Sequence, residues 1–440
     1  MTTPFSRRTL LGGAFAGFSA LSLAACGVSQ DEDTDVALSN EEVTLRFTWW
    51  GSDARHEVTQ KVIDAFQKEN PKIKIKGEFA DWVGYWDRLA TTFAASDAAD
   101  IVQMDELYLR TYADRGSLLD LGKTKEFLKT DGFSDISLAA GQAGGTQYAL
   151  PIGNGSLSAV VNTRLFDKYG VDLPDDTSWT WDDFADISAK IMEASGGDVV
   201  GSGALGTEAG LLTIWARQHG GALFDDEGKV VLDPAIPAEM WEFNRKLAGK
   251  GQPSAESTAE QLTAPLNQTW LVLGKQAINF NYNTQISSLQ EATKEETFKL
   301  LQLPQAAGGS APGFYYKPSM YWSISAGTQH PAEAAKFVDY LTNNTEAAKI
   351  LGTDRGIPAN EATLKAIRPS LDPTSELAAA YNDKVASVVA DPPALTPAGA
   401  SDINNLTARY MQEVLFDRQS AAEAGKKYVE ELTASVENAK

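Results

Sequence analysis

The side chains of this 440-residue sequence best suited to chemistry are aromatic rings that stand beside carboxylates. Trp50 and Asp53 come where a first strand is expected to end, and Asp105 and Tyr108 follow a short apolar run over 101–104. Open α/β sheets bind ligands beyond the carboxyl ends of their strands. Flat rings suit the apolar C–H faces of sugars, and carboxylates bond to sugar hydroxyls. The pattern therefore predicts a sugar-binding site.

Five further aromatic residues stand beside polar, glycine- or proline-containing stretches that are typical of loops and element ends: Trp82, Trp86, Tyr282, Tyr321 and Trp322. Any one tryptophan is explained equally well by packing in a core. The prediction of a sugar site therefore depends on the whole set rather than on one member.

The sequence gives little indication that the protein belongs to a common class of enzyme. The three histidines, His56, His219 and His330, lie far apart, and none belongs to a His-Glu-x-x-His metal pattern. The single cysteine, Cys26, permits no disulfide within the chain and no thiolate cluster. We expect no metal and no cofactor.

Two weaker motifs leave alternatives open. The glycines over 201–206, with Asp225 further on, have dinucleotide-binding spacing but lack the preceding βαβ context, so a loop is the better interpretation. The acidic pairs Asp105–Glu106 and Asp182–Asp183 could serve a glycoside hydrolase, which uses two carboxyl groups. With 59 acidic residues, such pairs also arise by chance, and they do not establish an active site.

The elements expected around these residues alternate between strand and helix. Val43, Leu45 and Phe47 alternate as in a strand, a helix begins at Ser52 or Asp53, and a second strand follows at 73–75. Further helices are expected through Trp86–Phe93, from a capping box at Thr180–Asp183, and over 331–341, with short strands at 277–282 and 320–326 and a hairpin at 223–231. This alternation predicts the α/β class.

The N-terminus has the form of an export signal. Arg7 and Arg8 precede an apolar run over 10–23 that is too short to span a bilayer. The arginine pair resembles a twin-arginine signal, although general secretory signals also carry such pairs, and Leu23–Cys26 resembles a bacterial lipobox. We expect a signal peptide over 1–25, lipidation of Cys26, such as palmitate, and an acidic tether over 26–41. The alternative is an ordinary cleaved signal that leaves a free thiol.

The charge of the chain excludes other partners. The formal net charge is −21, and loss of Arg7 and Arg8 with the signal makes it −23. So acidic a chain repels nucleic acid and offers no basic patch to anionic lipid. We expect no nucleic-acid binding and no membrane link besides the lipid.

Six stretches resemble a known family: residues 49–56, 100–105, 148–152, 274–277, 330–337 and 355–358. Through them the chain resembles the substrate-binding lipoproteins of bacterial carbohydrate ABC transporters, within the extracellular solute-binding proteins of the maltodextrin- and oligosaccharide-binding type. The stretches follow one another in family order from about Val43 to Asn360, so the resemblance covers the whole body of the protein.

The resemblance implies an α/β, two-lobe periplasmic-binding-protein-like fold, with a hinge that the chain crosses three times and a ligand cleft between the lobes. It places the N-terminal lobe at 42–152 plus 325–370 and the C-terminal lobe at 153–320 plus 375–440. The crossings would fall near 151–154, 319–325 and 368–375. A chain of this length also favours two lobes on size alone.

The positions that match the family imply the ligand contacts. Asp53 and Arg55 would bond to sugar hydroxyls, although Asp53 could merely cap its helix, and Arg355 could hold a carboxylate of its own lobe. The full set of expected contacts is Trp50, Asp53, Arg55, Trp82, Trp86, Asp105, Asn154, Tyr282, Asn283, Trp322 and Arg355.

The function that the resemblance implies is capture of a sugar or oligosaccharide by hinge closure, followed by delivery to an ABC permease in the membrane. The protein would be a monomer and not an enzyme, held by its lipid on the outer face of the bacterial cell membrane. Two alternatives stay open: a non-sugar solute bound by the same fold, and a secreted glycoside hydrolase.

Overall fold

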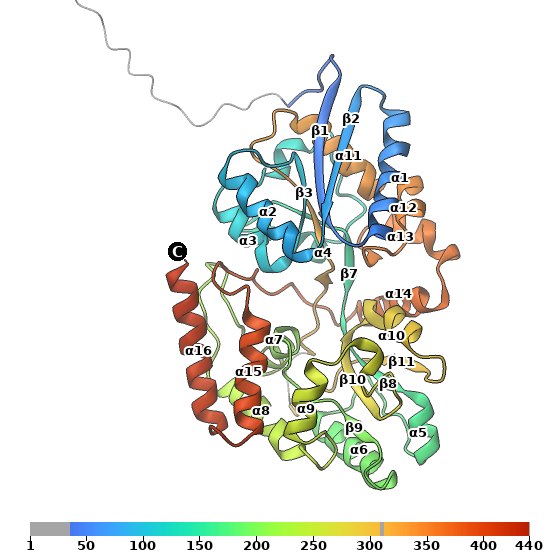
Figure 1. Ribbon diagram of the computed structural model, residues 1–440, viewed down its shortest axis with the longest axis vertical. Coiled ribbons are helices and arrows are strands. Elements are labelled where there is room, and N and C mark those ends of the chain that lie inside the picture. Colours follow the sequence, from blue (N-terminus) through green and yellow to red (C-terminus); the bar gives the residue numbers. More distant parts are fainter. Residues whose placement is uncertain (1–35, 309–311, 440) are drawn as a thin grey trace, which may run out of the picture. The chain divides into compact units, whose positions relative to one another are not determined.

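The computed structural model describes residues 36–308 and 312–439, and they belong to one compact unit, Val36–Lys440. The first lobe is built on a five-stranded sheet in the order β2-β1-β3-β13-β6 (Figure 1). β1 pairs in parallel with β2 and β3, whereas β13 is antiparallel to β3 and β6. The strands are β1 Val43–Trp50, β2 Ile73–Ala80, β3 Ile101–Met104, β6 Leu150–Pro151 and β13 Tyr321–Ile324.

The second lobe contains a four-stranded sheet in the order β11-β8-β10-β9. β8 is antiparallel to β10 and β11, and β10 is parallel to β9. These strands are β8 Leu157–Asn162, β9 Val200–Ser202, β10 Gln276–Tyr282 and β11 Phe298–Leu301.

Three short strands lie between the two main sheets. They form a small antiparallel sheet in the order β12-β7-β14, with β7 Gly153–Gly155, β12 Lys317–Pro318 and β14 Ile357–Pro358. In the chain, β7 lies between β6 of the first sheet and β8 of the second, and β12 directly precedes β13. The chain thus passes between the two sheets at β7 and at β12, which are hydrogen-bonded to each other, while β14, between α12 and α13, pairs with the other edge of β7. A further pair, β4 Gln142–Ala143 and β5 Thr146–Gln147, forms a small hairpin.

Helices cover both sheets. Those packed with the first sheet or adjoining it are α1 Asp53–Glu69, α2 Trp82–Ala94, α3 Glu106–Asp114, α4 Asp135–Ala139, α11 Pro331–Asn343, α12 Thr345–Leu351 and α13 Glu361–Ile367. The remaining α-helices are α5 Thr163–Tyr169, α6 Trp181–Ala194, α7 Ala209–Gln218, α8 Ala235–Leu247, α9 Ala255–Leu262, α10 Ile286–Ala292, α14 Pro373–Val385, α15 Ile403–Leu415 and α16 Ala421–Asn438. Single 3₁₀ turns occur at Leu121–Thr124, Leu266–Gln268, Asn283–Gln285 and Arg368–Ser370.

The sequence pattern explains why these elements form where they do. In β1, Val43, Leu45 and Phe47 are buried and alternate with less buried residues, as the pleat of a strand requires. Ser52 is the N-cap of α1, and its hydroxyl accepts a hydrogen bond from the backbone N–H of Arg55. The capping box expected at Thr180–Asp183 is present at the start of α6. The α/β class predicted from the alternation is confirmed.

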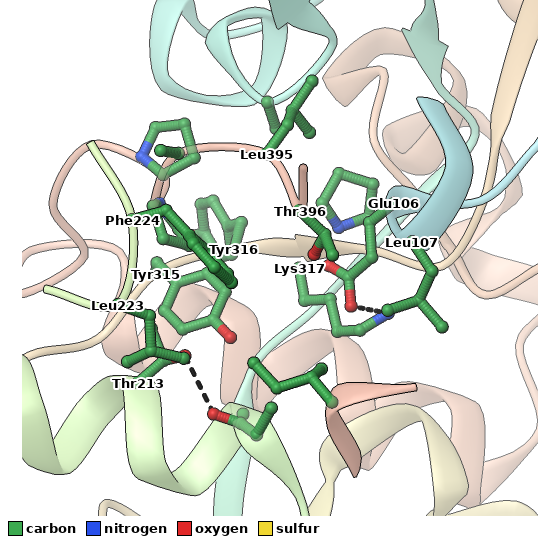
Figure 2. Close-up of a pocket in the computed structure, with 18 of the residues that line it drawn as sticks. Glu106, Leu107, Thr213, Leu223, Phe224, Tyr315, Tyr316, Lys317, Leu395 and Thr396 are labelled. Atoms are coloured by element: carbon green, nitrogen blue, oxygen red, sulfur yellow. Dashed lines mark hydrogen bonds and ion pairs between the residues drawn. The ribbon is translucent and has the colours of Figure 1, made fainter. Parts of the chain in front are cut away.

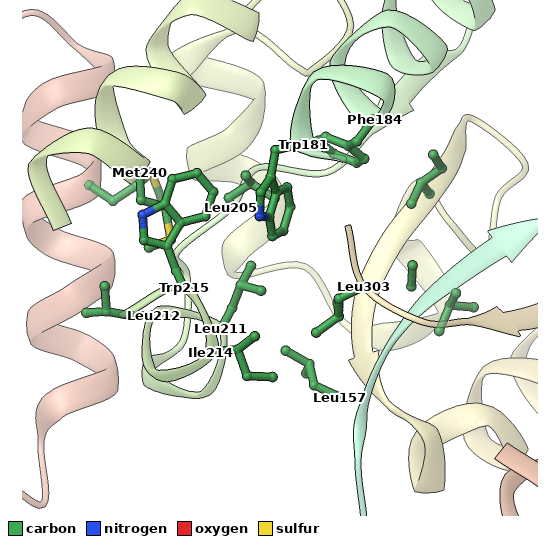
Figure 3. Close-up of a cluster of buried hydrophobic side chains, with 14 of the residues drawn as sticks. Leu157, Trp181, Phe184, Leu205, Leu211, Leu212, Ile214, Trp215, Met240 and Leu303 are labelled. Atoms are coloured by element: carbon green, nitrogen blue, oxygen red, sulfur yellow. The ribbon is translucent and has the colours of Figure 1, made fainter. Parts of the chain in front are cut away.

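Each lobe has its own hydrophobic core. In the first, Phe47 packs against the rings of Trp49, Trp322 and Phe337 at centroid distances of 4.8–5.3 Å. In the second, aromatic and aliphatic side chains from α6, α7 and α8 pack together; Figure 3 shows Trp181 beside Phe184, with Trp215 and Met240 nearby. Separate cores allow each lobe to keep its shape while the connecting strands bend.

The first 35 residues are outside the part of the chain that the structure describes. The expected signal peptide, Cys26 and the start of the acidic tether therefore lie there, and they remain predictions. Among the described helices, none is both long and apolar enough to cross a membrane.

Candidate functional site

A cavity of about 130 Å³ lies where the two lobes and their connecting strands meet. The first lobe contributes Glu106 and Leu107 of α3 and Tyr321 of β13, and the second contributes Tyr282 and the start of α7. Lys317 and Pro318, from connecting strand β12, form part of the wall. Figure 2 shows Glu106 and Leu107 of α3, Lys317 of β12 and Thr213 of α7 around this cavity. A ligand in this cavity would contact both lobes at once.

The segment 391–397, which joins α14 to α15 without regular structure, closes one side of the cavity. Its residues 392–396 line the cavity, and Leu395 also packs against the aromatic cluster of the first lobe. Beside it, the guanidinium of Arg110 on α3 donates to the backbone carbonyl of Asp226 in the second lobe at 2.8 Å. The two lobes are thus in contact on the side away from the connecting strands, which encloses the cavity.

An ion pair crosses the cavity wall. The Lys317 ammonium lies 3.0 Å from the Glu106 carboxylate, and the two side chains are 21% and 28% exposed (Figure 2). Burial raises the pKa of Glu106, and Lys317 works against that rise. Burial works to lower the pKa of Lys317, but Glu106 and Asp105 outweigh it, so the pKa of Lys317 lies above its ordinary value. Lys317 therefore stays charged and holds the connecting strand to α3.

Tyrosine rings supply the flat surfaces of the cavity. Tyr282 ends β10, and the Lys317 ammonium lies 5.5 Å from the centroid of its ring. Tyr315 lies under the guanidinium of Arg217, which is 5.7 Å from the centroid of its ring. Burial raises the pKa of both phenols well above the ordinary value, so both keep their protons and can donate to a ligand.

A glycine makes room for one of these rings. Gly210 lies in the first turn of α7, and a methyl group at this position would come 2.3 Å from the Tyr282 hydroxyl. Such a distance is far below van der Waals contact, so the absence of a side chain here allows Tyr282 to reach the cavity.

Four of the aromatic residues predicted from the sequence gather in the first lobe: Trp50, Trp82, Trp86 and Tyr108. Trp50 packs edge-on against Trp82 at 5.1 Å, and Trp86 stacks on Tyr108 at 3.9 Å. Trp50 and Trp86 are buried, whereas Trp82, the first residue of α2, is 39% exposed. Within the predicted set, Trp82 is thus the tryptophan whose ring is most available to a ligand.

Asp105 and Asp53 sit at helix starts that follow strands of the first sheet. Asp105 is the N-cap of α3 and accepts a hydrogen bond from the backbone N–H of Leu107 at 3.0 Å. Asp53 is exposed at the first position of α1, where Ser52 rather than Asp53 makes the capping bond. The Asp53 carboxylate is therefore not needed by its own helix.

The two arginines expected at the ligand are bound to the protein itself. Arg55 and Arg355 both lie within 3.0 Å of the Asp354 carboxylate. Arg355 is 3% exposed and also donates to Gln103 and Thr59, and burial lowers its pKa to about 9. In this conformation Arg355 holds a carboxylate of its own lobe, which was the alternative left open from the sequence.

Three other predicted residues are buried among protein groups. Trp322 is 1% exposed and lies in the first core, with the Arg355 guanidinium 5.2 Å from its ring. The Asn154 amide donates to the Ser137 hydroxyl at 3.0 Å, and the Asn283 amide donates to the side chain of Asn382 at 2.8 Å. In this conformation none of the three presents a free polar group or ring face to the cavity. Of the expected contacts Tyr282 lines the cavity, and so does Tyr321 of the wider aromatic set.

Sequence reasoning missed Lys317, Glu208 and Tyr315 as candidate contacts. Glu106 was noted only as half of an acidic pair. The available signal was the stretch Tyr315–Pro318, in which two tyrosines precede a lysine and a proline before an apolar strand. Nothing local shows that this lysine meets Glu106, which is more than 200 positions away. Within the described residues, no group of three or more acidic, histidine or cysteine side chains is arranged to hold a metal ion.

The fold and the cavity define a two-lobe binding protein, and comparison with known proteins gives its family. Residues 52–348 match the model of the bacterial extracellular solute-binding proteins, and the chain belongs to this family. This confirms the resemblance found in the sequence.

Three similar proteins illustrate how far the likeness extends. A structure of an extracellular solute-binding protein of family 1 from Alicyclobacillus acidocaldarius is 27% identical, covers 91% of this chain and 100% of its own, and superposes with a TM-score of 0.74. A periplasmic oligogalacturonide-binding protein from Yersinia enterocolitica is 22% identical, covers 90% and 99%, and has a TM-score of 0.78. An uncharacterized lipoprotein of Streptomyces antibioticus is 22% identical over 73% of this chain and 72% of its own length.

Proposed function

We propose that this protein is the lipid-anchored, extracytoplasmic solute-binding component of an ABC importer. It captures a sugar or oligosaccharide by hinge closure and delivers it to permease subunits in the membrane. Membership of the extracellular solute-binding family supports the general role, while the sugar, the anchor and the permease are the specific parts of this proposal.

The observation that carries the proposal is the composition of the cavity wall. Tyr282, Tyr315 and Tyr321 offer rings, and Glu106, Glu208 and Lys317 offer charged hydrogen-bonding groups, from both lobes and the connecting strand between them. Rings that stack on C–H faces beside groups that bond to hydroxyls are suited to a sugar. Because both lobes contribute, a bound sugar would stabilise the closed arrangement over an open one.

Similar proteins support the specific parts. The Yersinia protein of the same fold is described as binding an oligogalacturonide, and the Streptomyces relative is described as a lipoprotein. The second description agrees with lipidation of Cys26 after removal of residues 1–25. A receptor fixed to the membrane by a multiply acylated cysteine would remain near its permease.

Among the contacts predicted from the sequence, we propose Tyr282, Asp105, Asp53 and Trp82 as ligand contacts. Tyr282 lines the cavity, and Asp53 and Trp82 are exposed at the carboxyl edge of the first sheet. Asp105 lies at the same edge, buried, with one carboxylate oxygen accepting from the Leu107 N–H. Lys317 and Glu208 join them from the structure.

The test is titration of the mature protein with a panel of mono- and oligosaccharides, followed by tryptophan fluorescence and calorimetry. Saturable, reversible binding of at least one saccharide is expected, with Tyr282→Ala reducing affinity by about fivefold or more, since an anchoring ring is worth about 1–3 kcal/mol. Tyr169→Ala, on α5 and outside the cavity wall, is the matched control and should not change affinity.

Two results would refute the proposal. Binding of a non-sugar solute with no response to any saccharide would reassign the ligand. Steady release of shorter sugars after long incubation, followed by chromatography, would make the protein a hydrolase. The second outcome is worth measuring because burial raises the pKa of Glu106 and of Glu208, as in a general acid.

A further inference from the structure

Two grooves of the second lobe adjoin the cavity at Glu208. One, of about 270 Å³, runs past the end of β10, and the other, of about 540 Å³, runs between α9 and α15. Glu208, which directly precedes α7, lines the cavity and both grooves, and its side chain makes no capping bond to the helix. The cavity and the two grooves therefore adjoin one another at Glu208.

The groove at β10, here called the amide groove, is defined by Gln276, Asn279, Asn281, Thr207 and Leu262, among others. Side chains alternate across a strand, so Asn279 and Asn281 share one face of β10 while Tyr282 points to the opposite face. The same strand thus serves two spaces: Tyr282 lines the cavity, and the two asparagines line the amide groove.

The amides of the groove are held in a row. Gln276 donates to Asn279 at 2.9 Å, Asn279 donates to Asn281 at 2.7 Å, and Asn281 donates to Gln285 at 3.2 Å. Each NH₂ group has two donor hydrogens, and each amide oxygen has two lone pairs. The row fixes the orientation of the amides and still leaves Asn279 and Asn281 able to donate to and accept from a further partner.

The backbone opposite this row leaves space for it. A methyl group on Gly203, just after β9, would lie 2.5 Å from the amide oxygen of Asn279 and 2.8 Å from the amide nitrogen of Gln276. The amide row therefore packs directly against the backbone of Gly203, where a side chain would not fit. Leu262, Leu266 and Pro253 add an apolar wall to the amide groove.

Paired donors and acceptors in fixed positions beside an apolar wall are suited to the hydroxyls and C–H faces of a saccharide ring. The cavity itself is closed on its far side by residues 392–396. A chain of sugar units that starts in the cavity would reach the amide groove by passing Glu208, which lines both spaces.

We infer that the amide groove is a second saccharide subsite, continuous with the cavity, and that the ligand is a linear oligosaccharide whose terminal unit occupies the cavity while the next units pass Glu208 and bond to Asn279 and Asn281. This inference rests on the proposed function, because it requires a saccharide in the cavity. It adds the chain length, the direction of the chain and two contacts.

The experiment measures affinity by calorimetry for the saccharide series that binds in the fluorescence titration, from the monosaccharide to the tetramer, with the cyclic form of the same sugar included. Two additional hydrogen bonds predict a gain of about tenfold in affinity between the shortest and the longest linear members. Asn279→Ala and Asn281→Ala should each lower the affinity for the longest member by about threefold, half of this gain in free energy, and leave the affinity for the shortest member within about twofold. The cyclic sugar, which has no end to place in the cavity, should bind at least about tenfold more weakly.

The control variant is Asn405→Ala, in the other groove, where the Asn405 amide bonds only to the Asp402 side chain 2.5 Å away. It should leave the whole series unchanged, and the midpoint of thermal unfolding verifies that every variant is folded. Three results would overturn the inference while leaving sugar binding intact. The affinity could be independent of length, or Asn279→Ala could lower it equally for all lengths. The length-dependent loss could also appear in Asn405→Ala instead. If no saccharide of any length binds, the proposed function fails, and the inference fails with it.

Discussion

Replacement of Lys317 by methionine tests the electrostatics that tie connecting strand β12 to helix α3. Methionine keeps much of the length of the side chain but removes the ammonium that lies 3.0 Å from Glu106. The carboxylate of Glu106 then remains in a mostly buried place without its ion-pair partner. We expect a loss of stability and a change in its pH dependence.

The size of the loss follows from the burial of the pair. At 3.0 Å and an effective dielectric constant of about 20, the direct attraction is about 5 kcal/mol, and desolvation offsets much of it. Exposed pairs contribute less than about 1 kcal/mol, and removing one partner of a fully buried pair costs about 3–5 kcal/mol. With side chains 21% and 28% exposed, Lys317→Met should cost about 2 kcal/mol, an approximately thirtyfold change in the unfolding equilibrium.

The sign of the pH dependence follows from the pKa of Glu106. Burial raises this pKa above the ordinary value of 4.5, and Lys317 limits the rise, so removing Lys317 raises it further. Between the unfolded-state pKa and the raised folded-state pKa, the folded state binds more protons than the unfolded state, and stability falls as pH increases. The loss caused by Lys317→Met should therefore be smallest below pH 4.5 and reach its full size once Glu106 is ionised in the variant.

The assay is urea unfolding followed by tryptophan fluorescence at several pH values on both sides of this window. Glu106→Gln in the Lys317→Met background should restore most of the stability at neutral pH, because it removes the unpaired charge. Lys61→Met, at an exposed position of α1, is the matched control and should have little effect. A loss of equal size at all pH values, or no recovery in the double variant, would refute the reasoning.

Three further predictions follow from the same structure. Gly210→Ala should weaken saccharide binding, measured by calorimetry, without lowering the thermal midpoint by more than a few degrees, because alanine favours a helix while its methyl displaces Tyr282. Trp322→Ala should lower the free energy of unfolding by about 3–5 kcal/mol, since a fully buried ring is lost, whereas Trp82→Ala should instead weaken saccharide binding by about 1–3 kcal/mol. Cys26→Ser should release the protein from the membrane fraction and leave its affinity for the saccharide unchanged.

Each of these has a clear contrary result. Unchanged affinity in a folded Gly210→Ala protein would mean that Tyr282 does not need its present position. A stable Trp322→Ala protein that no longer binds saccharide would show that Trp322 contacts the ligand rather than stabilising the core. If Cys26→Ser stays in the membrane fraction, a lipid on Cys26 is not what anchors the protein.

Much of the fold could be predicted because its signals are local. The alternation of Val43, Leu45 and Phe47, the cap at Ser52 and the capping box at Thr180 each depend on neighbours within a few residues. The six family-like stretches keep their order along the chain, and the match over residues 52–348 confirms the family they indicated.

The candidate site was less predictable because side chains near strand ends can turn either to the ligand or to the core. Trp82 and Trp322 look alike in the sequence, yet one is 39% exposed and the other is 1% exposed. Arg355 could be expected at the ligand or at a carboxylate, and in this conformation its guanidinium is paired with the Asp354 carboxylate. The type of a residue does not show whether its side chain points to the ligand or to the core.

The sequence by itself indicated the family, through six stretches that resemble it, and the family model over residues 52–348 agrees. Composition and local periodicity also gave the acidic charge of −21, the α/β class and the expectation of a lipidated N-terminus. Only the tertiary structure decided that Lys317 meets Glu106, that Gly210 makes room for Tyr282 and that Asn279 and Asn281 form a row beside the cavity. These contacts join positions on separate elements or depend on the exact course of one strand. They exist only once the sheets have formed and the chain has crossed between the lobes.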